Sequence, residues 1–419
     1  MVNWAQTTQR IISQQTFDEA VQDNINDFEM ALDEAIQEAR SQFEAQGVDL
    51  TTILGERRSV MDDLNLAIAA KHEDDIMNVL KAIDDDEARG LADQGLIGAL
   101  LLICREYHEQ KPLVMASLNS LIQTRGLKIL AQVVGGFEPH KNTIHSNGFN
   151  DYICDILTKH QAEHEVFLRA CNVIKRYLSD DDRRPGVHPH TFTRARELAA
   201  MNDSEIISKM LSALKQNTGN PAYVSAICAT LRCIAVTDAI CQAISRDVLG
   251  DLIQIAKLHF DRDNVVEKTF SLFKIMSRND QVKVSVCSQE GVELAMLTLK
   301  HHTSNQKVIS QVVGMMAAIT LRQPENCLML ANNGIIPLLV SVMSGNSDHI
   351  AIQRGAISTL RNMVSSSRTK QLADLILEEN AEELICKAHD THEQCKDVAY
   401  AALRDLGRPY KATWNGIDS

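Results

Sequence analysis

The sequence has few aromatic residues and few prolines. Phe, Trp and Tyr make up 4% of its 419 residues, and 8 prolines are spread along it. No segment approaches the roughly 18 consecutive apolar residues that a membrane-spanning helix needs. The glycine-rich loops that hold phosphate groups and the glycine-flanked serine of many hydrolases are also missing. We therefore expect a protein without membrane-spanning helices, and nothing supports nucleotide-dependent or serine-hydrolase chemistry.

The 10 cysteines include no C-x-x-C pair, and most lie within apolar helical patterns. Residues 1–10 have neither the basic lead nor the apolar run of a secretory signal. We therefore expect reduced cysteines in the core rather than disulfides or zinc ligands. We also expect a cytoplasmic location, with the nucleus as a second one.

Negative charge exceeds positive charge only in the N-terminal part of the sequence. The formal net charge is -13; residues 1–90 hold 20 Asp and Glu against 7 Lys and Arg, whereas residues 91–419 hold 35 of each kind. The acidic segment argues against nucleic acids and anionic membranes as main ligands, because both would repel it. We expect a protein partner instead.

A helical repeat is the strongest pattern in the sequence. A patch of the form apolar-x-x-apolar recurs at spacings of 41, 44, 44 and 43 residues. Its starting residues are Leu231, Leu272, Met316, Leu360 and Leu403. Units of about 40–47 residues are typical of solenoids built from helix pairs or triplets. Earlier patches at Leu118 and Ile174 have wider spacings and so indicate insertions, one of which is the polar loop at residues 179–190.

A second recurring element, a small residue followed by an apolar run, comes about 25 residues before most of these patches. Its glycines are Gly95, Gly148, Gly291 and Gly334. Glycine permits a sharp turn and a close approach between helices. Each unit is therefore predicted to contain a short helix, a glycine turn, a second helix and a long third helix.

The sequence resembles the armadillo repeat family in residues 332–342 (NNGIIPLLVSV) and 356–364 (AISTLRNMV). The resemblance implies an all-α superhelical solenoid with a groove lined by the third helices. We expect about seven armadillo repeats over residues 91–410, followed by a C-terminal tail at residues 411–419.

Residues 1–90 are predicted to form an acidic amphipathic helical segment. Thr16 and Glu19 fit a capping box, and apolar residues follow at steps of 3 and 4 from Phe17 to Phe43. A second amphipathic stretch covers residues 60–83. The pattern leaves open whether the chain breaks at Met30.

This segment is similar to the leader of one subfamily of armadillo proteins from animal cells, in residues 16–30 and 42–50. That similarity implies a scaffold without established enzymatic activity. The segment's apolar stripe needs a partner, and terminal units of a solenoid need a cover. We therefore expect it to cap the first repeat; intramolecular docking in the groove, with a regulatory role, is the alternative.

His160, Glu163 and His164 match the H-x-x-E-H pattern of inverted zinc peptidases. Within one helix the two histidines would share a face, as zinc ligands should. The pattern falls, however, where one helix of a repeat should give way to the next, and no convincing third ligand lies nearby. A zinc-dependent hydrolase is therefore the less favoured alternative, and we predict no catalytic residue, no metal and no cofactor.

The third helices also bear on nuclear import. In karyopherin adaptors, the position before the second apolar anchor is Asn in repeat after repeat, with Trp four residues earlier, and this array holds a basic peptide. The corresponding residues here are Ser120, Arg176, Cys233, Lys274, Ala318, Asn362 and Asp405. No Trp stands four residues before any of them. A nuclear import adaptor is therefore disfavoured.

The groove is instead predicted to bind a peptide or helix that carries acidic and apolar groups. Arg176 and Lys274 would be cationic anchors, Asn362 a clamp on the partner's backbone and Phe270 an apolar contact. The sequence thus predicts a non-enzymatic scaffold or adaptor that holds a partner protein.

Two smaller features concern charge outside these positions. Ser179 precedes three aspartates and is a candidate phosphorylation site, although Ser and Asp also suit a helix end and a loop. Arg232, Arg361 and Arg404 occupy the same place in three repeats, and we expect them to pair with neighbouring repeats rather than with a ligand.

Overall fold

The computed structural model describes residues 10–28, 30, 32–50, 59–84, 87–106, 113–201, 205–288 and 290–408. The chain divides into two compact units; the first ends at Ile83 and the second begins at Asp84. The predicted all-α class is confirmed. In the described ranges, the only paired strands are β1 (Arg10–Ile11) and β2 (Val48–Asp49), which form a short parallel pair in the first unit.

The first unit begins with a pair of packed helices, α1 (Gln14–Phe28) and α2 (Leu32–Ala45). The apolar stripe from Phe17 to Phe43 is therefore divided between two helices, and the question left open at Met30 is settled as a break. Because the two stripes face each other, they enclose a small core. Its buried members are Phe17, Val21, Ala35, Ala39 and Leu50.

Helix caps in this unit differ from those predicted. The hydroxyl of Ser13 accepts a hydrogen bond from the backbone N–H of Thr16 at 3.1 Å, so Ser13 precedes the helix and Thr16 lies inside its first turn. The capping box predicted at Thr16 is wrong. A reciprocal capping box occurs instead at Ser59 and Asp62, before α3 (Val60–Ala70). Helix α4 (Glu73–Ala82) follows it, so the stretch at residues 60–83 is also two helices.

The described part of the second unit contains seven successive helical repeats. Their elements are α5 (Glu87–Leu91), η1 (Ala92–Leu96), α6 (Ile97–Glu106) and α7 (Leu113–Val134); α8 (Glu138–Ser146), α9 (Phe149–Lys159) and α10 (His164–Tyr177); α11 (Thr191–Ala200), α12 (Glu205–Gln216) and α13 (Pro221–Ile234); α14 (Asp238–Leu258) and α15 (Asp263–Met276); α16 (Asp280–Ser288), α17 (Gly291–His301) and α18 (Gln306–Thr320); α19 (Pro324–Asn332), α20 (Ile335–Gly345) and α21 (Ile350–Val364); and η3 (Ser367–Thr369), α22 (Leu372–Glu378), α23 (Ala381–Thr391), η4 (Glu393–Cys395) and α24 (Lys396–Asp405).

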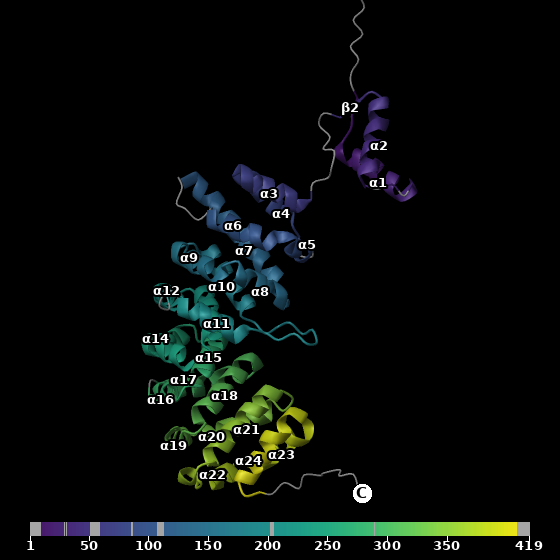
Figure 1. The fold of residues 1–419 in the computed structure, drawn as a ribbon. Coiled ribbons are helices and arrows are strands. Elements are labelled where there is room, and N and C mark those ends of the chain that lie inside the picture. Colours follow the sequence, from purple (N-terminus) through teal and green to yellow (C-terminus); the bar gives the residue numbers. More distant parts are fainter. Residues whose placement is uncertain are drawn as a thin grey trace, which may run out of the picture. The chain divides into compact units, whose positions relative to one another are not determined.

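The last helix of each repeat packs on the last helix of the next. This series runs through α7, α10, α13, α15, α18, α21 and α24 (Figure 1). Leu231, Leu272, Met316 and Leu360, which revealed the repeat in the sequence, are completely buried. The periodic patch is therefore the core of a solenoid, in which each repeat covers its neighbour.

The glycine turns separate the first and second helices in most repeats. Gly148 and Gly334 have φ values of 76° and 78°, a left-handed conformation that side chains disfavour. At Gly291 the left-handed residue is Glu290, and the glycine is required for space, because an added Cβ would lie 2.5 Å from the Val286 carbonyl oxygen. The fourth repeat has no such turn, and α14 runs through as one helix of 21 residues.

Three histidines connect successive repeats at the corner where the second helix ends. We call His259, His302 and His392 the histidine corners. Their Nε2 atoms donate to the carbonyls of Thr218 at 2.7 Å, Phe260 at 2.9 Å and Ser347 at 2.7 Å, respectively. Each acceptor lies at the equivalent corner of the preceding repeat. The histidine corners therefore add a polar tie to the apolar contact between repeats.

The described cysteines are all unpaired, and most are buried. Burial raises the pKa of the Cys171 and Cys228 thiols to about 12, so both thiols stay protonated. These positions agree with the predicted core role. Within the same residues, no single helix is long and apolar enough to cross a membrane; α19 and α20 reach the required length only together, and they are bent by 81°.

Candidate partner-binding groove

Five cations lie on or just after three consecutive last helices. We call Lys175, Arg176, Arg232, Lys274 and Arg278 the basic row. The first two belong to α10, Arg232 to α13 and Lys274 to α15, and Arg278 follows the end of α15. Within the described residues none of the five forms an ion pair, and Arg176, Arg232 and Arg278 are exposed. The surface of α10, α13 and α15 therefore carries positive charge that no carboxylate of the described residues neutralises.

Lys274 lies at the centre of the basic row. Its pKa is lowered first by burial of the half-exposed side chain and then by repulsion from Arg232 and Arg278. Its aliphatic part lies against α18, where a Cβ added to Gly314 would come within 2.8 Å of the Lys274 Cε atom. The ammonium group is thus held among like charges, and an anion bound beside it would relieve their repulsion.

Lys175, on α10, lies close to Arg232 of the basic row. Burial raises the pKa of the Cys233 thiol, and the charges of Arg232 and Lys175 oppose that shift. Both cations are therefore close to one cysteine on α13. Arg176 lies against the end of α7, with its Nη1 atom 3.3 Å from where a Gly135 Cβ would be. Arg176 and Lys274, predicted as anchors, thus belong to one continuous row.

Phe270 was predicted to be an apolar contact for the partner, and this prediction is wrong. Its ring is completely buried and meets Phe273 edge to face, with ring centroids 5.7 Å apart. Phe270 therefore stabilises the interior of the fourth repeat and offers nothing to a ligand.

Asn362 is half-buried on α21 and already holds a neighbouring repeat. Its Nδ2 atom donates to the Ala317 carbonyl at 3.0 Å and to the Thr320 hydroxyl at 3.3 Å. Since both hydrogens of the amide are engaged, Asn362 cannot donate to a peptide as the predicted clamp requires. The prediction is wrong for the donor half of the clamp, and Asn362 ties α21 to α18.

The arginines that share a place in the repeats have different partners. Arg361 pairs with Asp405 of the next repeat at 3.1 Å, as predicted. Arg404 pairs with its neighbour Asp405 at 2.8 Å, within its own helix. Arg232 has no carboxylate partner in the described part of the chain and belongs to the basic row. The predicted pairing between repeats is therefore confirmed for Arg361 alone.

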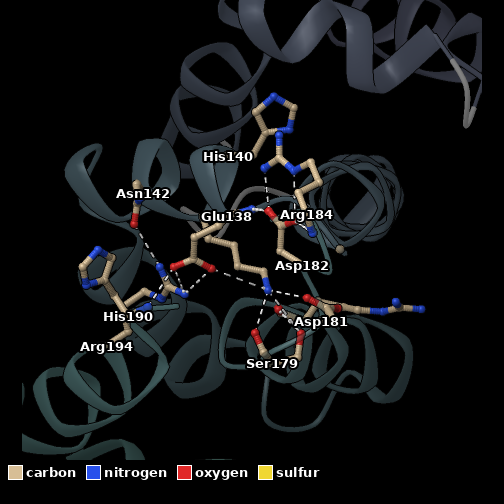
Figure 2. Close-up of polar contacts among 12 residues, drawn as sticks. Glu138, His140, Asn142, Ser179, Asp181, Asp182, Arg184, His190 and Arg194 are labelled. Atoms are coloured by element: carbon tan, nitrogen blue, oxygen red, sulfur yellow. Dashed lines mark hydrogen bonds and ion pairs between the residues drawn. The ribbon is translucent and has the colours of Figure 1, made fainter. Parts of the chain in front are cut away.

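A buried polar network holds the inserted loop at residues 179–190 against α8 and α11 (Figure 2). Glu138 and Arg194, both almost completely buried, form an ion pair at 2.8 Å. Glu138 also accepts from the backbone N–H of His190 at 2.9 Å, and Arg194 donates to Asn142 at 3.0 Å. Because buried charges are stable only when they are paired, this cluster fixes where the loop re-enters the fold.

The beginning of the same loop is held by Lys141 and Asp182. Lys141 donates to the Ser179 carbonyl at 2.7 Å and to Asp181 at 2.5 Å. Asp182 accepts from Arg184 and from the backbone N–H of Glu138, and these hydrogen bonds lower its pKa far below the usual value. Asp182 thereby caps α8. Each charged side chain of the network is paired with an opposite charge inside it, so we assign it a structural role.

Ser179, the candidate phosphorylation site, is part of this network (Figure 2). Its hydroxyl donates to the Arg176 carbonyl at 2.7 Å and accepts from Lys141 at 3.4 Å. The side chain is half-buried, which suits a helix end. Phosphorylation of Ser179 stays a prediction.

The H-x-x-E-H pattern does not lie on one helix. Helix α9 ends at Lys159, His160 and Glu163 occupy the junction, and His164 begins α10. His160 meets Glu163 at 2.8 Å, whereas His164 packs on the Tyr223 ring, with centroids 4.6 Å apart. The shared helical face that a zinc peptidase motif requires is therefore absent, and the predicted junction between two helices is confirmed.

Sequence reasoning missed two cations of this surface, Lys175 and Arg278, and assigned a third, Arg232, to pairing between repeats. The basic row uses residues beside the groove position and one helical turn beyond it. A signal was present in the sequence, since Lys274 and Arg278 stand four residues apart and therefore face the same way.

Comparison with known proteins identifies the class. A family model described as Armadillo/beta-catenin-like repeat matches residues 323–365, which cover α19 to α21. An engineered protein solved by the Northeast Structural Genomics Consortium aligns with 95% of this chain and 100% of its own, at 14% identity and a TM-score of 0.55. A designed armadillo repeat protein aligns with 73% and 99% at a TM-score of 0.39, which is too low to bear on the fold. The chain is an armadillo-repeat solenoid.

Within that class, the chain is similar to armadillo repeat-containing protein 6. The model of that protein's N-terminal domain matches residues 9–74. The protein of Pongo abelii is 26% identical over 387 residues, which are 77% of this chain and 76% of the relative. The protein of Homo sapiens is 25% identical with the same coverage, and the Drosophila melanogaster homolog is 23% identical over 78% and 80%. The resemblance inferred from the leader is confirmed.

Proposed function

We propose that this chain is a non-enzymatic adaptor that holds an acidic segment of a partner protein across the last helices of its repeats. The observation that carries the proposal is the basic row, whose cations have no carboxylate partner in the described residues. Armadillo solenoids expose such surfaces over several repeats, and a long surface can bind a partner without catalytic machinery.

The dimensions of the basic row suit an extended peptide. Packed helices are spaced by ~8–10 Å, so α10, α13 and α15 span ~16–20 Å. An extended chain rises ~3.3 Å per residue, so roughly five or six residues cover this distance. A segment with several carboxylates in that length would meet Arg176, Arg232 and Lys274 in turn.

Two observations favour an adaptor over the alternatives. A nuclear import adaptor must attract basic peptides, and the basic row would repel them. A zinc hydrolase needs ligands that converge on one metal, and the described residues contain no group of three or more His, Cys, Asp or Glu placed to do so. The proposal defines the partner by one property, an acidic segment that pairs with the basic row.

Binding of labelled peptides to the full chain tests the proposal. A fluorescein-labelled peptide of mixed Asp and Glu should bind, in fluorescence anisotropy, more tightly than a basic peptide of equal length and than a single-stranded oligonucleotide. Its affinity should fall as salt is added, because salt screens exposed charges. Preference for the basic peptide would favour the import adaptor, and preference for the oligonucleotide would also contradict the proposal.

Charge reversal locates the site. The double substitution Arg232→Glu and Lys274→Glu should weaken binding of the acidic peptide by about tenfold or more, since each exposed pair contributes ~0.2–1 kcal/mol and reversal adds repulsion. Lys300→Glu with Lys370→Glu is the matched control, because both lysines are exposed and lie outside the last helices. Equal losses in the two double variants would mean that net charge, and not this surface, binds the peptide.

We also propose a cytoplasmic location. Protonated, unpaired cysteines such as Cys171 and Cys228 suit a reducing compartment. Imaging of the tagged full chain tests this, and retention in the secretory pathway would contradict it. The expected capping or regulatory role of the acidic N-terminal segment stays a prediction.

A further inference from the structure

The surface of α18 and α21 contains a hollow next to the basic row. Its volume is about 840 Å³, and it opens between these two helices and the start of η4. Lys274, Gly314, Ile350, Arg354 and Ser358 are among the residues that line it. Volumes of roughly 300–1,000 Å³ are typical of sites that enclose small organic groups.

Small residues produce the hollow. The last helices here carry Ser310, Gly314 and Ala317 on α18, and Ala351, Gly355 and Ser358 on α21. The two glycines are needed where helices pack closely: a Cβ on Gly355 would lie 2.7 Å from the Val313 Cγ2 atom, and one on Gly314 would meet Lys274. The glycines therefore make room for Lys274 and Val313, and the hollow opens beside these contacts, where Ser310, Ala317, Ala351 and Ser358 leave space.

Two cations flank this floor. Lys274 lies over Gly314 on one side, and the exposed Arg354 of α21 lies on the other. In the described chain neither has an ion-pair partner. Among the described residues that line the hollow, Asp348 is the one carboxylate, and it accepts from the Ser347 hydroxyl at 3.2 Å. The hollow therefore combines an uncharged floor with an excess of positive charge around it.

We propose that this hollow receives a tryptophan or phenylalanine side chain of the partner segment, while carboxylates beside that residue pair with Lys274 and Arg354. The inference rests on the proposed function and deepens it, because it names the motif that the surface selects. An aromatic ring buries a large area at a low cost in side-chain entropy, and such anchors commonly fill pockets at the centre of protein interfaces. The groove has no tryptophan of its own here, since Gly314 and Ser358 occupy the positions four residues before Ala318 and Asn362. In this proposal the ligand provides the aromatic ring that fills the space.

Two matched peptides test the motif. The first is a fluorescein-labelled acidic peptide with a central Trp, and the second has Ala in that place. Full-length protein should bind the Trp peptide about tenfold or more tightly than the Ala peptide. In methyl-labelled protein, the Trp peptide alone should shift the Ile350 δ1 methyl signal, because Ile350 lines the hollow.

A variant whose own side chain fills the hollow tests whether the peptide's ring binds there. Ser358→Trp places a ring in the hollow from within and should abolish the preference for the Trp peptide, while the Ala peptide keeps its affinity. Ser341→Trp, at an exposed serine of the second helix α20, should leave both affinities unchanged. The circular dichroism and melting temperature of each variant establish that it folds. If Ser358→Trp does not fold, the peptide comparison and the Ile350 signal in the unmodified protein still decide.

The outcomes separate the two proposals. If both peptides bind with equal affinity and Ile350 does not respond, the aromatic motif is wrong and the acidic-partner proposal stands. If the preference for Trp survives Ser358→Trp, the ring binds elsewhere and the assignment to this hollow fails. If neither peptide binds, the proposed function fails together with this inference.

Discussion

At the scale of single residues, charged side chains in the described part of the second unit occur in two arrangements: buried and paired, or half-buried without an opposite charge. Glu138 and Arg194 are buried and paired, and each makes further hydrogen bonds. Lys274 is half-buried and stands among other cations. Since a buried charge without a partner is costly whereas a hydrated one is not, the first arrangement stabilises the fold and the second remains available to a ligand.

The Glu138–Arg194 pair leads to a prediction about stability. Arg194→Met leaves the buried Glu138 with only Lys141, at 4.0 Å, as a cation, and should lower the free energy of unfolding by ~3–5 kcal/mol. Urea denaturation followed by circular dichroism measures this. Arg196→Met, on the same helix but at an exposed position, is the control and should stay within ~0.5 kcal/mol. Similar losses in the two variants would show that the buried pair has no special role.

Residue roles could be predicted from the sequence only in part. The repeat period placed Arg176 and Lys274 on the exposed side of their helices, where the structure has them. It failed for Phe270, because the equivalent positions of α18 and α21, Gly314 and Ser358, lie at the surface, whereas the large apolar ring of Phe270 packs into the core beside Phe273. Asn362 failed for another reason: which acceptor an amide finds depends on the neighbouring repeat, and the sequence does not place that acceptor.

At the scale of elements, the junctions between helices carry much of the specificity of this fold. Gly148 and Gly334 supply the left-handed turns, and the histidine corners supply bonds from one repeat to the preceding one. Helix existence followed from apolar periodicity. Helix ends followed only in part. The junction between His160 and His164 was predicted, whereas the start of α1 was not, because it depends on which nearby group caps the chain: Ser13 rather than Thr16.

The histidine corners can be tested at His302. Its ring is almost completely buried, with Nδ1 at 2.8 Å from Asp263 and Nε2 at 2.9 Å from the Phe260 carbonyl. His302→Ala should therefore cost ~1–3 kcal/mol, because it leaves a buried acceptor unpaired. The adjacent His301 is about half exposed, and His301→Ala should have little effect. Thermal or urea unfolding compares them, and equal stability of His302→Ala and the unmodified protein would remove the structural role assigned to these corners.

At the scale of the second unit as a whole, each repeat depends on its immediate neighbours. The last helices contact one another in sequence order, from α7 to α24. Stability in such an array is approximately a sum of repeat terms and nearest-neighbour terms, so local damage spreads outward in steps. The sequence predicted this architecture well, because the repeat spacing alone requires it. The prediction that every unit contains a glycine turn is wrong for the fourth repeat, where α14 is unbroken.

Leu360 provides the test of this behaviour. It is completely buried on α21, and Leu360→Ala should cost ~2–5 kcal/mol through the cavity it leaves. In hydrogen exchange measured by mass spectrometry, protection should fall in α21, α18 and α24, with α10 little changed. Leu375→Ala, at a largely exposed position of α22, is the control. A uniform loss of protection along the unit would contradict a neighbour-by-neighbour solenoid.

The direction of the histidine corners also bears on how the protein is made. In each one, a later residue donates to a carbonyl that precedes it by one repeat: His259 to Thr218, His302 to Phe260 and His392 to Ser347. During translation, each of these carbonyls lacks its histidine donor until the next repeat has left the ribosome. The three hydrogen bonds therefore become possible in sequence order, first at Thr218, then at Phe260 and last at Ser347.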